Sequence, residues 1–223
     1  MEFTRYAIYY MPPEGAFAAF GARWLGWDAL RGRPVPQPDL PGIAALTGTP
    51  RKYGFHGTLK PPFRLAPGTT ADGLSRAVQA LAADTAPALA PGLQLSRLGR
   101  FFALTIDGEE TGVARIAAAC VTGLDGFRAR PSEAELARRR KSQLSPRQEA
   151  LLQAWGYPHV LDAFRFHLTL TERVERAALY AVEEQIRAHL PDLPAPFRVD
   201  DIVLAGERPD GRFQLVERFT LTG

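Results

Sequence analysis

The hydrophobic and polar positions at the start of the chain predict a strand, then a helix, then an irregular segment. Residues 5–11 (RYAIYYM) are rich in aromatic and β-favouring side chains and stop at a Pro-Pro pair, which indicates a strand. Apolar positions at helical spacing over residues 15–26 predict a short amphipathic helix. Residues 31–50 contain five prolines and are therefore expected to form mostly a loop with one helical turn.

The rest of the chain alternates between hydrophobic patterns typical of strands and of helices. The stretch FHGTLK at residues 55–60 predicts a strand that ends at Pro61-Pro62. Further strands are expected at residues 93–107, where two strands meet near Gly99, at 164–170, and at 197–222, which form a hairpin with its turn at Pro209-Asp210-Gly211. Helices are expected at residues 69–86, 112–127, 132–156 (broken near Ser145-Pro146) and 175–190.

One five-residue pattern, Phe-His-x-Thr-Leu, occurs twice, in FHGTLK at residues 55–60 and in FHLTLT at residues 166–171. A predicted helix follows each copy, and two strands containing Gly-Arg-Phe follow the helix. The spacing from the histidine to the arginine of that tripeptide is 44 residues in the first unit and 45 in the second. Repetition of a whole supersecondary unit is far less probable by chance than repetition of a short pattern.

This repeat predicts the fold class. We expect one α+β domain over residues 1–223, with histidine-strand, helix and hairpin units at about 51–107 and 162–223. Two similar lobes related by a pseudo-twofold axis would have antiparallel sheets lining a central cleft and helices outside. The two histidine strands would then face each other across the cleft.

Alternation along each strand places histidine and threonine on the same face, because successive side chains of a strand point to opposite sides. His56 and Thr58 share one face of the first strand, and His167 and Thr169 share one face of the second. An imidazole titrates near neutral pH, so one ring can accept a proton while the other donates one. Hydroxyl groups beside them can hold the oxygens of a phosphate.

A metal site is the main alternative interpretation of the two histidines. Catalytic zinc normally has three protein ligands, and no third histidine or acidic residue stands at ligand spacing near either copy of the pattern. We therefore expect no metal and no cofactor. The chain also contains no GxxxxGKS, GxGxxG or GxSxG motif. His159 and His189 lie outside the pattern and are interpreted as structural.

Composition narrows the class of protein only a little. Of 223 residues, 46% are hydrophobic and 23% charged, as in ordinary globular domains, and the net charge of +3 is too small to indicate a nucleic-acid-binding protein. The single cysteine, Cys120, stands in an apolar stretch and is expected in the core. No signal peptide or membrane-spanning run is present, which predicts a cytoplasmic protein with no membrane partner. The sequence leaves the oligomeric state open.

The paired histidine–threonine patterns resemble the 2H phosphoesterase superfamily, which includes RNA 2′,3′-cyclic phosphodiesterases and 2′-5′ RNA ligases. Three stretches, PRKYGFHGTLKPPF, LSPRQEALLQAWGYPHV and DAFRFHLTLTERV, resemble a bacterial branch of unknown function associated with phosphonate-utilisation genes. The resemblance covers essentially the whole chain. It implies a bilobal fold with a central groove, metal-independent phosphoester chemistry, and a cyclic sugar phosphate as a candidate substrate.

The resulting functional hypothesis is a cyclic phosphodiesterase, a hydrolase acting on a small cyclic phosphate such as a phosphoribosyl cyclic phosphate. His56 and His167 would share the acid and base roles, and Thr58 and Thr169 would hold the phosphoryl oxygens. The candidate substrate contacts are Lys60, Arg165 and Tyr53. Two alternatives remain: an enzyme processing or joining RNA 2′,3′-cyclic phosphate ends, and a non-catalytic sensor of a phosphorylated ligand. The assignment of base and acid, the role of the basic run at 138–141 and the tyrosine that faces the cleft remain open.

Overall fold

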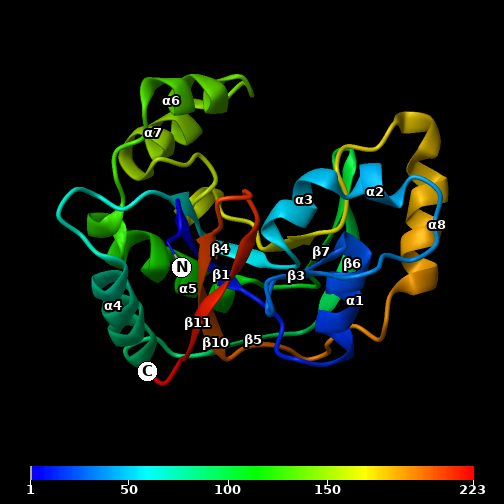
Figure 1. The fold of residues 1–223 in the computed structure, drawn as a ribbon, viewed down its shortest axis with the longest axis horizontal. Helices are drawn as coiled ribbons and strands as arrows, with labels where there is room; N and C mark the ends of the chain where they lie inside the picture. Colours follow the sequence, from blue (N-terminus) through cyan, green and yellow to red (C-terminus); the bar gives the residue numbers. More distant parts are fainter. Residues whose placement is uncertain (1) are drawn as a thin grey trace.

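The structure is a computed structural model that describes residues 2–223, and its centre is a single seven-stranded sheet (Figure 1). Every strand pairing in this sheet is antiparallel, and the strand order is β11-β10-β1-β4-β8-β7-β6. The sheet strands are β1 (Tyr6–Tyr10), β4 (Gly57–Phe63), β6 (Leu93–Leu98), β7 (Phe101–Ile106), β8 (His167–Thr169), β10 (Asp201–Glu207) and β11 (Phe213–Thr220). Two small two-stranded sheets add β2 (Trp27–Asp28) with β3 (Arg33–Pro34), and β5 (Ala88–Ala90) with β9 (Phe197–Val199).

The helices gather at the two sides of this sheet (Figure 1). They are α1 (Ala16–Leu25), α2 (Ile43–Leu46), α3 (Gly48–Tyr53), α4 (Ala71–Ala83), α5 (Thr111–Gly123), α6 (Glu133–Arg140), α7 (Pro146–Trp155) and α8 (Leu179–His189). Helices α4 and α5 lie on the side of the termini, and α1, α2, α3 and α8 lie on the opposite side. We call α6 and α7 the helical arm, because Figure 1 shows them projecting together above the rest of the molecule. The α+β prediction with antiparallel strands is confirmed.

Each predicted unit has the expected element order, but the two units are interleaved. The hairpin β6–β7, which follows the first histidine strand in sequence, pairs with the second histidine strand, β8. The hairpin β10–β11, which follows β8, lies on the other side and is joined to the first histidine strand β4 through β1. The two histidine strands are therefore direct neighbours inside one continuous sheet.

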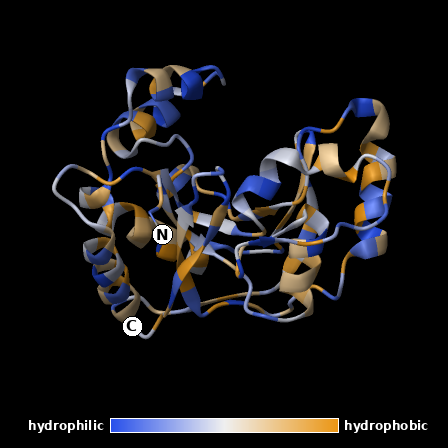
Figure 2. Ribbon diagram, viewed as in Figure 1, coloured by the Kyte–Doolittle hydropathy of each residue, from blue (hydrophilic) through white to orange (hydrophobic). Residues whose placement is uncertain are grey.

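The main hydrophobic core lies on one face of the sheet. Its members come from strands and from the helices that cover them, and include Ile8, Leu59, Leu168, Cys120 and Val78, all at most 1% exposed. Cys120 is thus in the core, as its apolar sequence context predicted. In Figure 2 hydrophobic and hydrophilic positions alternate along both strands and helices, as expected for elements with one buried and one exposed face. No helix among residues 2–223 has the length and apolarity needed to cross a membrane.

The first histidine strand runs further than predicted. Pro61 and Pro62 were expected to end it, but β4 continues to Phe63. The register against β1 is irregular between the pairs Tyr6–Phe63 and Ile8–Lys60, so the prolines sit in a bulge. Proline is tolerated there because a bulge residue need not donate a ladder hydrogen bond.

Candidate functional site

The two histidine patterns meet where β4 pairs with β8. Gly57 lies opposite Leu168 in an antiparallel register. The antiparallel register therefore places His56 directly across from Thr169, and Thr58 directly across from His167. His56 and His167 are thus diagonal neighbours, which sheet geometry sets about 7–8 Å apart, and this leaves room for a phosphoryl group between the two imidazole rings. The alternation predicted from the sequence brings all four side chains to one face.

Close packing at this pairing depends on a residue without a side chain. A Cβ atom at Gly57 would lie 2.4 Å from Cε2 and 2.6 Å from Cζ of Phe166, whose side chain is 1% exposed. Phe166 and Leu168 face the core, so their burial holds β8 against β4. The buried apolar residues of the repeated pattern thereby fix the positions of its histidine and threonine.

Both histidine rings are oriented in the same way by the backbone two residues earlier. The Nδ1 atom of His56 lies 2.9 Å from the Gly54 carbonyl oxygen, and Nδ1 of His167 lies 2.9 Å from the Arg165 carbonyl oxygen. A carbonyl oxygen can only accept, so Nδ1 carries the proton in each ring and Nε2 is left as the acceptor of a neutral imidazole. In His56, Nε2 lies 3.0 Å from the Thr58 hydroxyl, which donates to it.

The carbonyl that orients His56 depends on a glycine. Gly54 ends α3 with φ of +75°, a backbone conformation that side-chain-bearing residues rarely adopt. A Cβ atom there would also lie 2.4 Å from the Cβ atom of Ala29. Gly54 therefore turns the chain sharply from α3 into the first histidine strand.

Two tyrosine rings lie beside the His56 ring. This ring lies 3.9 Å from the ring of Tyr9, centroid to centroid, and 6.1 Å from that of Tyr53, which stacks on Phe213. Burial of the ring lowers the pKa of His56 to about 4, and the neighbouring His167 contributes in the same direction. His56 is therefore a neutral imidazole at pH 7. Of the N-terminal tyrosines, Tyr9 is therefore the one whose ring lies against His56.

The NMR titration of His56 should show this directly. We expect its ring nitrogens to keep the shifts of the neutral Nδ1–H tautomer from pH 8 down to pH 5, with a midpoint at about 4. Replacing Tyr9 by Ala opens the ring to water and should move the midpoint toward 6.5. A wild-type midpoint between 6 and 7 would show that the ring is not desolvated.

A cavity of about 460 Å³, which we call the histidine groove, opens beside these residues. The residues that line it come from α3 and the turn after it, from β7, and from the end of β8 and the segment after it: Thr49, Pro50, Tyr53, Gly54, His56, Phe101, Thr169, Thr171, Glu172 and Arg173. The exposed Arg173 supplies positive charge at the groove. The Glu172 carboxylate accepts a hydrogen bond from the Thr49 backbone N–H. Within residues 2–223, no group of three or more His, Cys, Asp or Glu side chains is arranged to hold a metal ion.

Of the three residues proposed as substrate contacts, only Tyr53 lies in the groove. Lys60 was placed there by strict alternation along β4, and this is wrong. A register irregularity between the pairs Tyr9–Thr58 and Ile8–Lys60 turns Lys60 onto the core face. There its side chain is 2% exposed, and its Nζ atom donates to the carbonyl of Val121 at the end of α5.

Lys60 should instead give the protein a measurable pH dependence of stability. Burial lowers the pKa of Lys60 to about 8, although Asp125, 3.6 Å away, acts in the opposite direction. Between pH 8 and 10.5 the unfolded chain then binds more protons than the folded one, so stability rises with pH. Relative to Lys60→Met, the wild type should gain roughly 1–3 kcal/mol in unfolding free energy between pH 7 and 10. Urea denaturation at both pH values, with the exposed Lys52→Met as control, measures this; parallel curves for wild type and Lys60→Met would contradict it.

Arg165 also lies outside the lining of the groove. Its side chain is 77% exposed and lies 3.6 Å from the Glu110 carboxylate. Its contribution to the site is its backbone carbonyl, which orients His167. Glu172 and Arg173 were not predicted as site residues, although both follow the second pattern directly and could have been found by extending it.

Two curated relatives share the sequence over most of this chain. A protein of Janthinobacterium sp. (strain Marseille) is 35% identical over 99% of the chain, and one of Laribacter hongkongensis (strain HLHK9) is 33% identical over 83%. Both are named ribose 1,5-bisphosphate phosphokinase PhnN. The matches cover 51% and 44% of these proteins, so the chain spans about half the length of the curated relatives it matches.

These relatives overturn the activity predicted from the sequence. The prediction was a hydrolase that opens a cyclic phosphate, with RNA-end processing and ligand sensing as alternatives. The relatives are instead named for a kinase, which transfers a phosphoryl group to an acceptor. The error arose because two facing imidazoles describe proton transfer at a phosphate and do not identify the group that receives the phosphoryl.

Solved structures and a family model complete the comparison. The LigT protein of E. coli, solved with 3′-AMP, is 16% identical, with full coverage of both chains and a TM-score of 0.45. The model of the family described as "Protein of unknown function (DUF1045)" matches residues 58–214. This match covers the second half of the first histidine pattern and all of the second, and the chain belongs to that family.

Proposed function

We propose that the histidine groove binds a phosphorylated ribose and that His56 accepts the proton of a ribose hydroxyl during phosphoryl transfer. The observation that carries this proposal is a neutral imidazole whose Nε2 lone pair is directed to a hydroxyl, here that of Thr58 at 3.0 Å. A substrate hydroxyl that displaces Thr58 would meet the same lone pair. General-base catalysis needs this geometry first and a suitable pKa second.

The names of the relatives and the character of the groove support a sugar phosphate as the ligand. The two relatives are named for ribose 1,5-bisphosphate. A volume of about 460 Å³ is within the usual range for small-molecule sites. The lining combines threonine hydroxyls, which can donate to phosphate oxygens, with Arg173, which can neutralise phosphate charge. Tyr53 provides an aromatic surface for the sugar ring.

As the ribose hydroxyl oxygen forms its bond to the terminal phosphorus of a nucleoside triphosphate donor, Nε2 of His56 takes up the hydroxyl proton. The bond from that phosphorus to the bridging oxygen breaks, and its electron pair leaves with the nucleoside diphosphate. Thr169 and His167, across the strand pairing, would donate hydrogen bonds to the phosphoryl oxygens, His167 when its Nε2 is protonated. The proposal concerns the acceptor sugar; the sequence contains no GxxxxGKS loop for a nucleotide donor.

Calorimetric titration with ribose 1,5-bisphosphate, ribose 5-phosphate and ribose tests the proposal. We expect both phosphorylated sugars to bind at least about tenfold more tightly than ribose, as charge-assisted hydrogen bonds to a phosphate require. Thr169→Val should weaken their binding, whereas Thr122→Val, on the exposed surface of α5, should not. Equal affinity for ribose and its phosphates, or no binding of any of them, would refute the proposal.

A further inference from the structure

Arg139, on the helical arm, is a partly buried cation without a carboxylate partner for its Nε atom. That atom is buried and has no hydrogen-bond partner among the described residues. The acidic residues close to it in sequence are engaged elsewhere, since Glu135 pairs with Arg64 and Glu149 pairs with Arg140. A desolvated charge with no counter-charge is costly, so its presence needs an explanation.

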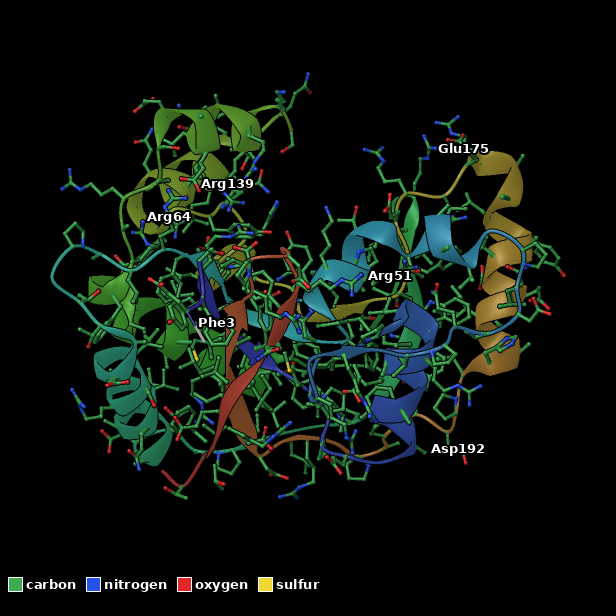
Figure 3. The ribbon with its side chains drawn as sticks, in the orientation of Figure 1. Phe3, Arg51, Arg64, Arg139, Glu175 and Asp192 are labelled. Atoms are coloured by element: carbon green, nitrogen blue, oxygen red, sulfur yellow. The ribbon has the colours of Figure 1, made fainter. Side chains whose placement is uncertain are left out.

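The surroundings of Arg139 direct it toward the histidine groove. Figure 3 shows Arg139 below α6, on the side of the arm that faces the rest of the molecule. Its guanidinium lies over the ring of Tyr157, 4.5 Å from the ring centroid. Burial lowers the pKa of Arg139, while Tyr157, Glu135 and Tyr53 act in the opposite direction. Tyr53, which lines the groove, is thus within electrostatic range of Arg139.

His159 adds a hydrogen-bond donor beside the same tyrosine. The Oε1 atom of Gln148 accepts from the Ser145 backbone N–H in the capping box of α7, which fixes the orientation of the amide. The Gln148 amide nitrogen then points to Nδ1 of His159, 3.3 Å away, and must be the donor. Nδ1 is therefore an acceptor, and the neutral ring carries its proton on Nε2, the opposite tautomer to His56. The His159 ring lies 5.8 Å from that of Tyr157.

The other buried polar atom without a partner among the described residues belongs to Tyr9. The hydroxyl of Tyr9 is buried without a hydrogen-bond partner in the described part of the chain, although its side chain is in contact with His56. Burial, with smaller contributions from Tyr53 and Tyr157, raises its pKa well above the ordinary value, so it is a neutral donor. Buried donors without partners are rare in native proteins and are often satisfied by a water molecule or ligand.

We propose that Arg139, with the N–H of His159 and the Tyr157 ring beside it, forms a second anion site that holds the second phosphate of a bisphosphorylated sugar. This inference rests on the function proposed for the histidine groove and specifies the substrate class of that site. The planar guanidinium fits two oxygens of a phosphate at once. A monophosphate in the histidine groove would leave this second site empty, so Arg139 selects sugars with two phosphates.

The test compares two ligands in three proteins. Ribose 1,5-bisphosphate and ribose 5-phosphate are titrated by calorimetry into the wild type, Arg139→Gln and Arg138→Gln. Arg138 is the matched control, because it is the adjacent arginine on α6 and is exposed. We expect Arg139→Gln to weaken bisphosphate binding roughly ten- to a hundredfold and to leave monophosphate binding within about twofold. Arg138→Gln should change neither by more than about twofold. Circular dichroism and thermal unfolding confirm that each variant is folded.

Each outcome bears on a different claim. If the wild type binds neither sugar phosphate, the function proposed for the groove fails and this inference fails with it. If the wild type binds both with equal affinity, the groove proposal stands and the second anion site is refuted. Equal losses of bisphosphate binding in Arg139→Gln and Arg138→Gln would show a general effect of positive charge and would also refute the site. Arg139→Lys should recover only part of the loss, because an ammonium keeps the charge but not the two-pronged contact.

Discussion

Replacing His56 by alanine is expected to lower the rate of phosphoryl transfer roughly 10²- to 10⁴-fold, the range that a positioned general base contributes. The physical reason is the arrangement of the ring: Nδ1 is held by the Gly54 carbonyl, and Nε2 is free to exchange Thr58 for a substrate hydroxyl. Binding should change little, since alanine removes the proton acceptor and leaves Thr169 and Arg173 in place. The reaction of ribose 1,5-bisphosphate, followed by ³¹P NMR with and without Mg-ATP, measures the rate.

The pH profile of the wild type adds a second readout for the same prediction. Because burial holds the pKa of His56 at about 4, the base stays unprotonated and the rate should be level from pH 7 to 5 on its account. A fall in rate with a midpoint near 6.5 would mean that a different, solvated imidazole is the base. His189→Ala is the control, since His189 ends α8 and makes its Nδ1 contact with the Gln185 carbonyl. Equal rates in His56→Ala and His189→Ala would exclude His56 from the chemistry.

The fold was predictable from the sequence where local patterning determines it. The 3.6-residue period placed α4 and α5, and the turn at Gly211, with φ of +79°, joined β10 to β11 as predicted. The exchange of hairpins between the two halves was not predictable, because it depends on which distant strand each hairpin pairs with. The two-unit repeat is the same in a side-by-side and an interleaved arrangement, so only the strand order distinguishes them.

The candidate site, like the fold, was predictable where local patterning determines it and not where distant segments meet. The repeated pattern brought His56, Thr58, His167 and Thr169 to one face, because alternation along a strand is local. Lys60 was misplaced by the same rule, since a bulge changes the alternation and leaves no mark in a single sequence. His159 was interpreted as structural, and the role of the basic run that contains Arg139 was left open. Their relation to Tyr157 arises from the way the helical arm folds back, which no short-range pattern contains.

The largest expected effect on stability is at Gly57, where the two histidine strands meet. Gly57→Ala adds a Cβ atom about 2.4 Å from the Phe166 ring, which is enclosed by the core and cannot move aside. We expect a loss of about 2–3 kcal/mol in unfolding free energy, at the upper end of overpacking effects. Urea denaturation measures it, with Gly126→Ala as control, because a Cβ atom at Gly126 has no neighbour within 4 Å and the change should stay within about 0.5 kcal/mol.

A compensating variant shows whether the collision is the cause. The ring atoms closest to the added Cβ are Cε2 and Cζ of Phe166, and a leucine at that position lacks both. Phe166→Leu alone should cost about 1 kcal/mol or more through lost packing. Combined with Gly57→Ala it should cost less than the sum of the two single changes, by about 1 kcal/mol or more. Strict additivity would mean that Gly57 is required for its backbone alone. Because any separation of β4 from β8 also moves His56 away from Thr169, the double variant should recover affinity for ribose phosphates together with stability.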